Sequence, residues 1–305
     1  MQWIIFCILA ASFFSISVFI DNYLTDVIFK DKKPQSIKVV DAFLYLILAI
    51  AIAVIFGLKE MPIALIILAI ISGAITSLAS LPYYLGLRDE EATTATIFFQ
   101  ITPILCIIGD FIILNRTITQ QQIYGFILVL SAPFIITLAR QHKKTRKLEL
   151  KASLLLLAHA VLYAIGSIVY AKAEQDKPDT MTLYFWFIIG RSLFDFIVTI
   201  IRPSLRKRIK QVMKVSPAKF LITTVATLAF AVAGDFLLRY SYTITATSLA
   251  TVLSNASELI ITFILGIILT LIWPKFGREK LNRHIIVSHL IAIILVVIGI
   301  ILTNL

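Results

Sequence analysis

Hydrophobic residues fall in ten long runs along this chain, and short polar segments separate the runs. The runs cover residues 3–27, 40–58, 62–86, 92–114, 121–139, 152–173, 182–201, 220–242, 246–272 and 285–303. An α-helix rises 1.5 Å per residue, so about 20 apolar residues cross a hydrocarbon core of roughly 30 Å. The pattern therefore predicts an all-α integral membrane protein with ten transmembrane helices.

The composition supports this prediction and narrows the range of functions. Hydrophobic residues make up 59% of the 305 residues and charged residues 15%, which is more apolar than a soluble domain requires. The first run has neither a basic leader nor a small-residue cleavage site, so we expect it to remain as a helix. Cys7 and Cys106 lie inside predicted spans, so we expect no disulfide, no metal site and no cofactor.

Basic residues concentrate at one end of the predicted bundle. The segments that follow the first, third, fifth, seventh and ninth runs hold 22 of the 28 Lys and Arg residues, whereas the segments at the opposite end hold four. Such a bias marks the cytoplasmic side of a membrane protein. We therefore expect a multi-pass plasma-membrane protein with both termini outside the cytoplasm. The basic segments RQHKKTRK and RKRIKQVMK should contact anionic membrane lipid and not nucleic acid.

The chain repeats itself in altered form at an offset of 155 residues. The segment ATIFFQITPI, which begins at Ala95, aligns with ATVLSNASEL, which begins at Ala250. This places Gln100 opposite Asn255 and Pro103 opposite Glu258. Five helices per half is an odd number, so the second half would cross the membrane in the opposite direction, as in many secondary transporters. We expect a first five-helix repeat at 1–139, a basic linker at 140–151 and a second repeat at 152–305.

Pro103 lies inside the fourth run. A proline at membrane depth frees a backbone carbonyl, and lipid cannot supply the missing donor. Gln100 lies one turn before the proline and Thr102 lies beside it. We therefore expect polar side chains or a cavity to compensate, and the fourth helix to line a pathway.

The sequence resembles the drug/metabolite transporter superfamily, specifically the EamA-type permeases. The resemblance rests on Y-Y-x-x-L-x-x-x-E-A-T from Tyr83 to Thr93, on Q-x-x-P at Gln100 and Pro103, and on the segments TITQQQIYGF and VVIGIIL. It implies ten helices in two inverted five-helix repeats. It also implies a secondary transporter, not an enzyme, that exports or exchanges a small organic metabolite by alternating access.

The chain departs from this family pattern at three points. Asn115 and Arg116 replace the acidic residue that usually follows the fourth helix, and Glu258 replaces the proline of the second half. Family members usually place both termini in the cytoplasm, which is the opposite of what the charge bias predicts here.

Ionisable residues inside the runs are candidates for function, since each costs about 2.5–3.5 kcal/mol to insert into a membrane. Arg191 and Asp195 are four residues apart and so share one helix face. We expect them to form an internal ion pair; alternatively, Arg191 holds an anionic group of the substrate. Asp235 and Arg239 repeat the same spacing in the next run.

Glu258 is a second candidate, because the ninth run contains no basic residue that could pair with it. Desolvation favours the neutral form of a buried carboxylic acid, which lets such a group bind and release a proton. We expect Glu258 either to take part in substrate binding or proton coupling, or to pair with Arg191.

The residues predicted to bind the substrate share a polar or aromatic side chain inside or at the end of a run. They are Gln100, Asn255, Glu258, Asn22, Tyr84, His159 and Arg191. A lone histidine at such a position is more often an interhelical hydrogen-bond donor than a proton relay. The expected partners are a small-molecule metabolite and membrane lipid, and the sequence leaves a homodimer open.

Other functional classes fit the sequence less well. An intramembrane metalloenzyme needs ligand spacings such as H-E-x-x-H, which the four histidines do not provide. Asp195 and Asp235 are the conceivable aspartyl dyad, but each has an arginine four residues away that would keep it ionised. The remaining alternative is a membrane channel or a non-transporting membrane scaffold.

Overall fold

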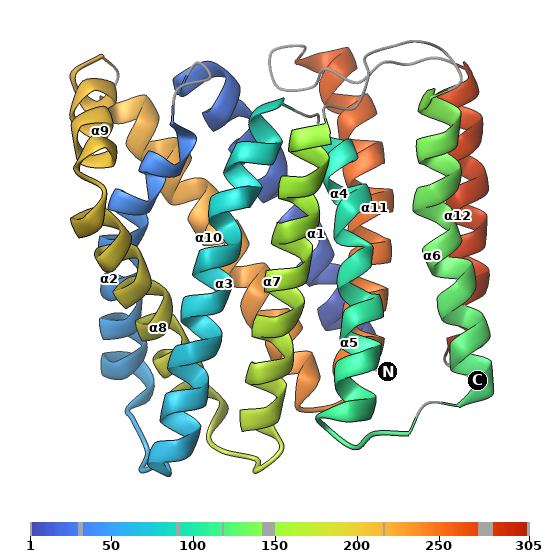
Figure 1. Cartoon of the computed structure of the whole chain (residues 1–305), viewed down its shortest axis with the longest axis horizontal. Helices are drawn as coiled ribbons and strands as arrows, with labels where there is room; N and C mark the ends of the chain where they lie inside the picture. Colours follow the sequence, from blue (N-terminus) through green and yellow to red (C-terminus); the bar gives the residue numbers. More distant parts are fainter. Residues whose placement is uncertain are drawn as a thin grey trace.

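The computed structural model is a bundle of helices (Figure 1) that describes residues 2–29, 33–89, 92–117, 119–141, 150–215, 217–273 and 283–303. The α-helices are α1 (Gln2–Tyr23), α2 (Lys38–Phe56), α3 (Ile63–Asp89), α4 (Ala92–Phe99), α5 (Ile101–Ile112), α6 (Gln120–Gln141), α7 (Leu150–Glu174), α8 (Thr180–Ile201), α9 (Pro203–Val215), α10 (Pro217–Tyr242), α11 (Thr247–Ile272) and α12 (Arg283–Thr303). Within this described part, eight segments are long and apolar enough to cross a membrane. The predicted all-α, multi-pass membrane fold is therefore confirmed.

The helix α9 is an element that the hydropathy pattern did not predict. Its buried apolar residues, Leu205, Ile209 and Val212, recur at helical spacing on one face. The rest of the helix is strongly basic, so a search for long apolar runs passes over it. Its Arg208 side chain donates a hydrogen bond to the Phe29 carbonyl oxygen at 2.8 Å, which attaches α9 to the segment after α1.

The long helices pack in a pattern that interleaves the beginning and the end of the chain. The helix α3 packs against α7 and α8, α2 packs against α8, and α1 packs against α10 and α11 (Figure 1). The broken pair α4 and α5 lies between α7 and α11, and α6 packs against α12 at one edge of the bundle. Both termini lie at the end of the bundle opposite α9 (Figure 1).

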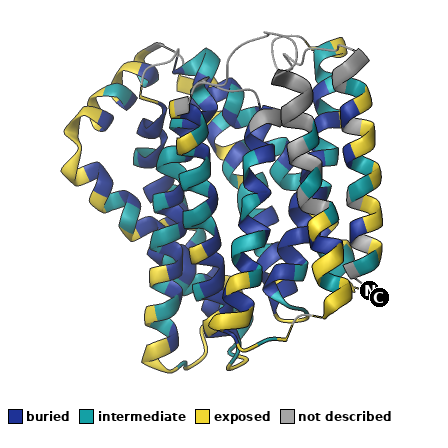
Figure 2. Ribbon diagram, turned by 45° about the vertical axis from the view of Figure 1, so that its right-hand side comes forward, coloured by how far each residue is buried: buried dark blue, intermediate teal, exposed yellow. Residues whose placement is uncertain are grey.

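The surface of the bundle is apolar, whereas many polar side chains lie inside. Large hydrophobic residues such as Val54, Ile272 and Ile63 are 79%, 78% and 75% exposed, and exposed positions lie on the outer faces of the helices (Figure 2). In contrast, Lys38, Asp195 and other charged residues are buried. This distribution suits a protein whose outer solvent is lipid and whose interior holds the polar groups.

Two glycines bring α3 and α8 into direct backbone contact. A Cβ atom at Gly73 would lie 2.0 Å from the Phe187 carbonyl oxygen, and one at Gly190 would lie 2.2 Å from the Ile70 carbonyl oxygen. Small residues allow helices to approach this closely in a membrane. The close approach sets α8 against α3 beside the charged residues described below.

The start of α8 is fixed by a capping interaction at the terminal end of the bundle. The Asp179 carboxylate accepts a hydrogen bond from the backbone N–H of Thr182 at 3.1 Å, which satisfies a free donor of the first turn. The hydrogen bond from the Lys59 ammonium, followed by that from Thr182, holds the pKa of Asp179 below its usual range. The loop before α3 is thereby joined to α8.

Candidate functional site

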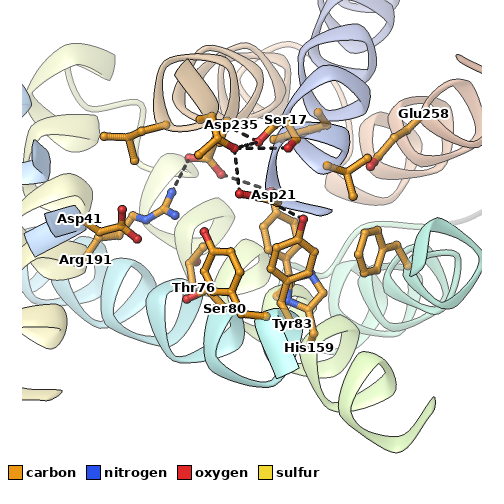
Figure 3. Close-up of a pocket in the computed structure, with 18 of the residues that line it drawn as sticks. Ser17, Asp21, Asp41, Thr76, Ser80, Tyr83, His159, Arg191, Asp235 and Glu258 are labelled. Carbon is orange, nitrogen blue, oxygen red and sulfur yellow. Dashed lines mark hydrogen bonds and ion pairs between the residues drawn. The ribbon is translucent and has the colours of Figure 1, made fainter. Parts of the chain in front are cut away.

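A cavity of about 150 Å³ lies in the interior of the bundle (Figure 3). Its walls come from α1, α2, α3, α4, α5, α7, α8, α10 and α11, and so from both predicted halves of the chain. Its polar and charged lining residues are Ser17, Asp21, Lys38, Asp41, Tyr45, Thr76, Ser80, Tyr83, Tyr84, Thr102, His159, Tyr163, Arg191, Thr227, Asp235, Asn255 and Glu258.

The predicted consequence of Pro103 is confirmed in one wall of this cavity. The helical path is interrupted at Gln100, where α4 ends and α5 begins. Pro103 has no N–H to offer the carbonyl of Phe99, four residues earlier. The Asn255 side-chain nitrogen donates to that carbonyl oxygen at 2.8 Å instead. An amide from the second half of the chain thus replaces the donor that the proline removes from the first half.

Gln100 makes a second contact between the same two helical segments. Its side-chain nitrogen donates to the Asn255 carbonyl oxygen at 2.8 Å and approaches the Thr96 carbonyl oxygen at 3.3 Å. The two residues that the 155-residue offset pairs thus each donate a side-chain hydrogen bond to a backbone carbonyl of the other half, Gln100 to Asn255 and Asn255 to Phe99. Asn255 lines the cavity, whereas Gln100 lies behind its wall.

Glu258 lies one turn after Asn255 on α11 and lines the cavity (Figure 3). Its residue is 6% exposed, and the structure describes no hydrogen bond or ion pair of its carboxylate with any described residue. The predicted alternative of a pair with Arg191 is wrong, because Arg191 lies beside Asp235. Glu258 is thus a buried carboxylate that faces an open space.

The predicted ion pair between Arg191 and Asp195 is also wrong. The Arg191 guanidinium lies 4.0 Å from the Asp235 carboxylate on α10 and stacks on the Tyr45 ring, with 4.4 Å to the ring centroid. Asp235 is shared, since the Arg239 Nε donates to it at 2.9 Å. The four-residue spacing put both side chains on one face, but the neighbouring helices offer each of them a closer partner.

Asp195 pairs with Lys38, which the charge count had placed in a loop. Lys38 is the first residue of α2, and it is only 1% exposed. Its ammonium lies 3.2 Å from Asp195 and 3.8 Å from Asp41, and it donates to the Ser77 hydroxyl at 2.9 Å. The removal of this single cation from the basic end leaves the direction of the charge bias unchanged.

Asp21 is a second cavity residue that is not among the predicted substrate-binding residues. It is 5% exposed on α1. The Tyr83 hydroxyl and the Thr227 hydroxyl each donate to its carboxylate at 2.9 Å. These partners are neutral, so the hydrogen bonds orient the carboxylate without cancelling its charge.

The remaining predicted residues occupy different places. His159 and Tyr84 line the cavity, and the His159 Nδ1 donates to the Ala79 carbonyl oxygen at 2.9 Å, which matches the expected interhelical donor. Asn22 lies next to Asp21 and outside the lining. The signal that could have found Asp21, Lys38 and Asp41 is weak, because each lies near the end of an apolar run, where solvated charges are ordinary.

No metal centre accompanies the cavity in the described part of the chain. The described residues contain no group of three or more His, Cys, Asp or Glu side chains that could hold a metal ion. Cys7 and Cys106 are buried as free thiols.

Comparisons with known proteins bear on the family and on the fold of this chain. Residues 1–138 match the model of the EamA-like transporter family. A crystal structure of a protein is similar with a TM-score of 0.60 at 14% sequence identity, over 96% of this chain and 95% of that chain. No curated protein matches significantly. At such low identity the structural likeness shows the fold alone, whereas the family match bears on the type of protein. Residues 1–138, a little under half of the chain, thus match the EamA-like transporter family of the drug/metabolite transporter superfamily, the family that the sequence motifs predicted.

Proposed function

We propose that this protein is a secondary transporter that moves a small organic metabolite across the plasma membrane by alternating access, in export or exchange. One observation carries the proposal: a polar, charged cavity lies between helices of both predicted halves in a membrane protein of a transporter family. Transporters with inverted repeats bind their substrates near the midplane, between the repeats.

The packing of the helices supports two inverted repeats of five helices each. The helix α1 packs against α10, and its counterpart α7 packs against α3, the counterpart of α10. In the same way, α1 contacts α11, while α7 contacts α4 and α5. With α6 and α12 as the fifth helix of each half, ten helices span the membrane. The family match ends at residue 138, close to the predicted boundary at 139.

The direction of insertion follows from the charges at the two ends of the bundle. The basic helix α9 lies opposite the termini (Figure 1), and two cations at the terminal end are matched locally, Lys59 by Asp179 and Arg116 by Asp110. These charges support our proposal that both termini face away from the cytoplasm. A C-terminal alkaline phosphatase fusion should be active and a C-terminal green fluorescent protein fusion dark; the reverse pattern would overturn this orientation.

Solute counterflow in proteoliposomes tests the transport function. Vesicles that contain the purified protein are preloaded with an unlabelled metabolite, chosen because it raises the apparent stability of the protein in detergent. A carrier accumulates the labelled metabolite transiently and saturably. Flux without saturation would indicate a channel, and no flux for any stabilising metabolite would indicate a scaffold.

A further inference from the structure

The cavity contains more acidic than basic groups, and the arrangement of these groups indicates the charge of the ligand. Four carboxylates, Asp21, Asp41, Asp235 and Glu258, line it, against the two cations Lys38 and Arg191. The carboxylate of Asp195 and the guanidinium of Arg239 lie behind the wall and join the same network. Together the five acids exceed the three bases by two.

The bases are already engaged by the network. Lys38 lies between Asp41 and Asp195, and Asp235 lies beside both arginines. These contacts match three cations with three carboxylates. Arg191 retains one buried donor without a partner, its Nε, and it is therefore the residue that an anionic ligand would use.

The two carboxylates left over are Asp21 and Glu258. Asp21 is bound by hydroxyl groups alone, and Glu258 is 6% exposed with no partner for its carboxylate among the described residues. Both face the cavity (Figure 3), Asp21 from α1 and Glu258 from α11. An unmatched buried carboxylate is costly, and a ligand that brings a positive charge removes that cost.

Aromatic rings lie beside these carboxylates. The hydroxyl of Tyr83 donates to Asp21. The centroid of the Tyr83 ring lies 5.1 Å from that of Tyr84, 6.0 Å from that of Phe99 and 5.1 Å from that of His159. Faces of such rings attract organic cations within about 6 Å. They also offer an apolar surface for the body of a small molecule.

We propose that the cavity binds an organic cation with an apolar or aromatic body, whose positive charge is matched by Asp21 and Glu258 and whose body packs on the Tyr83, Tyr84 and Phe99 rings. This assignment rests on the proposed transport function and names the substrate class of the same site.

Two probes of similar size and opposite charge test the assignment on the full-length protein in detergent. Benzyltrimethylammonium is a permanent cation and 3-phenylpropionate is an anion of similar shape. Benzyltrimethylammonium should raise the apparent unfolding temperature in a saturable manner, and 3-phenylpropionate should not. This comparison needs no variant, so it does not depend on how any substitution folds. Stabilisation by the anion alone, or by neither probe, would overturn the assignment.

Isosteric variants locate the binding. D21N and E258Q should each weaken benzyltrimethylammonium binding at least tenfold, whereas E174Q, which removes a buried carboxylate outside the cavity, should leave it unchanged. Equal binding in all three variants would overturn the assigned site. Anion binding that is lost in R191Q would overturn the charge class while leaving a carrier in place. Cation binding without counterflow of the same probe would support the assignment and contradict the proposed transport function.

Discussion

At the scale of single residues, the cavity wall depends on the match between Pro103 and Asn255. The proline removes one helical hydrogen bond in the first half, and the asparagine restores a donor to the same Phe99 carbonyl from the second half. A buried carbonyl without a donor costs about 1–3 kcal/mol. Asn255 is therefore expected to contribute to stability through the proline and not through packing alone.

The substitution N255L should lower the free energy of unfolding by about 1–3 kcal/mol, since it leaves the Phe99 carbonyl without a partner. In the P103A background the loss should be smaller, because the introduced alanine supplies an N–H within its own helix. Thermal unfolding of the four proteins in one detergent gives the double-mutant cycle. Additive effects of the two substitutions would contradict this coupling.

Lys38 is the second residue with a large expected effect. The K38M substitution leaves Asp41 and Asp195 without their cation inside the bundle, and removal of one partner of a buried ion pair costs roughly 3–5 kcal/mol. The double variant K38M/D195N removes one of the two uncompensated charges and should recover part of the loss. Urea or thermal unfolding of the single and double variants measures the difference; a double variant less stable than K38M would argue against the pair.

Glu258 is the residue whose substitution we expect to change transport itself. If its carboxylate exchanges protons during transport, E258Q should abolish the dependence of the transport rate on pH and lower the rate at least tenfold. E174Q provides the matched control, since Glu174 is equally buried but lies outside the cavity. Transport by E258Q at the rate of the unmodified protein, with the same pH profile, would exclude both substrate binding and proton coupling by this residue.

At the scale of elements, α8 is held by its cap at Asp179 and by its contact with α3. The backbone approach at Gly73 and Gly190 keeps Arg191 close to Asp235 of α10. It also keeps Asp195 close to Lys38 of α2 and to the Ser77 hydroxyl of α3. A change in this crossing would move both charged residues at once. The network therefore depends on helix packing as well as on the residues that form it.

The variant G73A should destabilise the protein by about 2 kcal/mol or more, since overpacking costs roughly 1–3 kcal/mol and occasionally more. The cause is the added Cβ atom, which would lie 2.0 Å from the Phe187 carbonyl oxygen, a backbone atom of α8. G234A is the control, since the nearest atoms to its Cβ lie 3.0 Å away. Unfolding temperatures of the two variants should differ clearly. Equal stability would show that α8 shifts away from α3 without penalty.

The elements were largely predictable from the sequence, whereas the partners inside the cavity were not. Long apolar runs predict helices such as α7 directly, because hydropathy and helix length are local properties. The hydropathy pattern does not predict α9, because its buried hydrophobic residues, three among those whose burial is described, recur at helical spacing and form no long apolar run. Asp195 was assigned to Arg191 because spacing along one helix is visible in a sequence, and its actual partner Lys38, 157 positions away, is not.

At the scale of the whole molecule, the two halves contribute to one cavity and interlock at its wall. Two hydrogen bonds join the halves, from the Gln100 side chain to the Asn255 carbonyl and from the Asn255 side chain to the Phe99 carbonyl. The pair of Lys38 and Asp195 joins them as well. Alternating access requires such contacts to rearrange as one half rocks against the other. From the proposed alternating access we therefore predict that the cavity opens to each side of the membrane in turn.

The most direct test of this claim is the labelling of a cysteine placed in the cavity. Ser80 lines the cavity on α3, and both native cysteines are buried, so S80C is introduced after C7A and C106A. A membrane-impermeant maleimide is applied to right-side-out and to inverted vesicles. The control is T243C, because Thr243 is exposed at the terminal end of the bundle and a cysteine there should react from the outside only. We predict that S80C reacts from both sides, and reaction from one side alone would contradict alternating access.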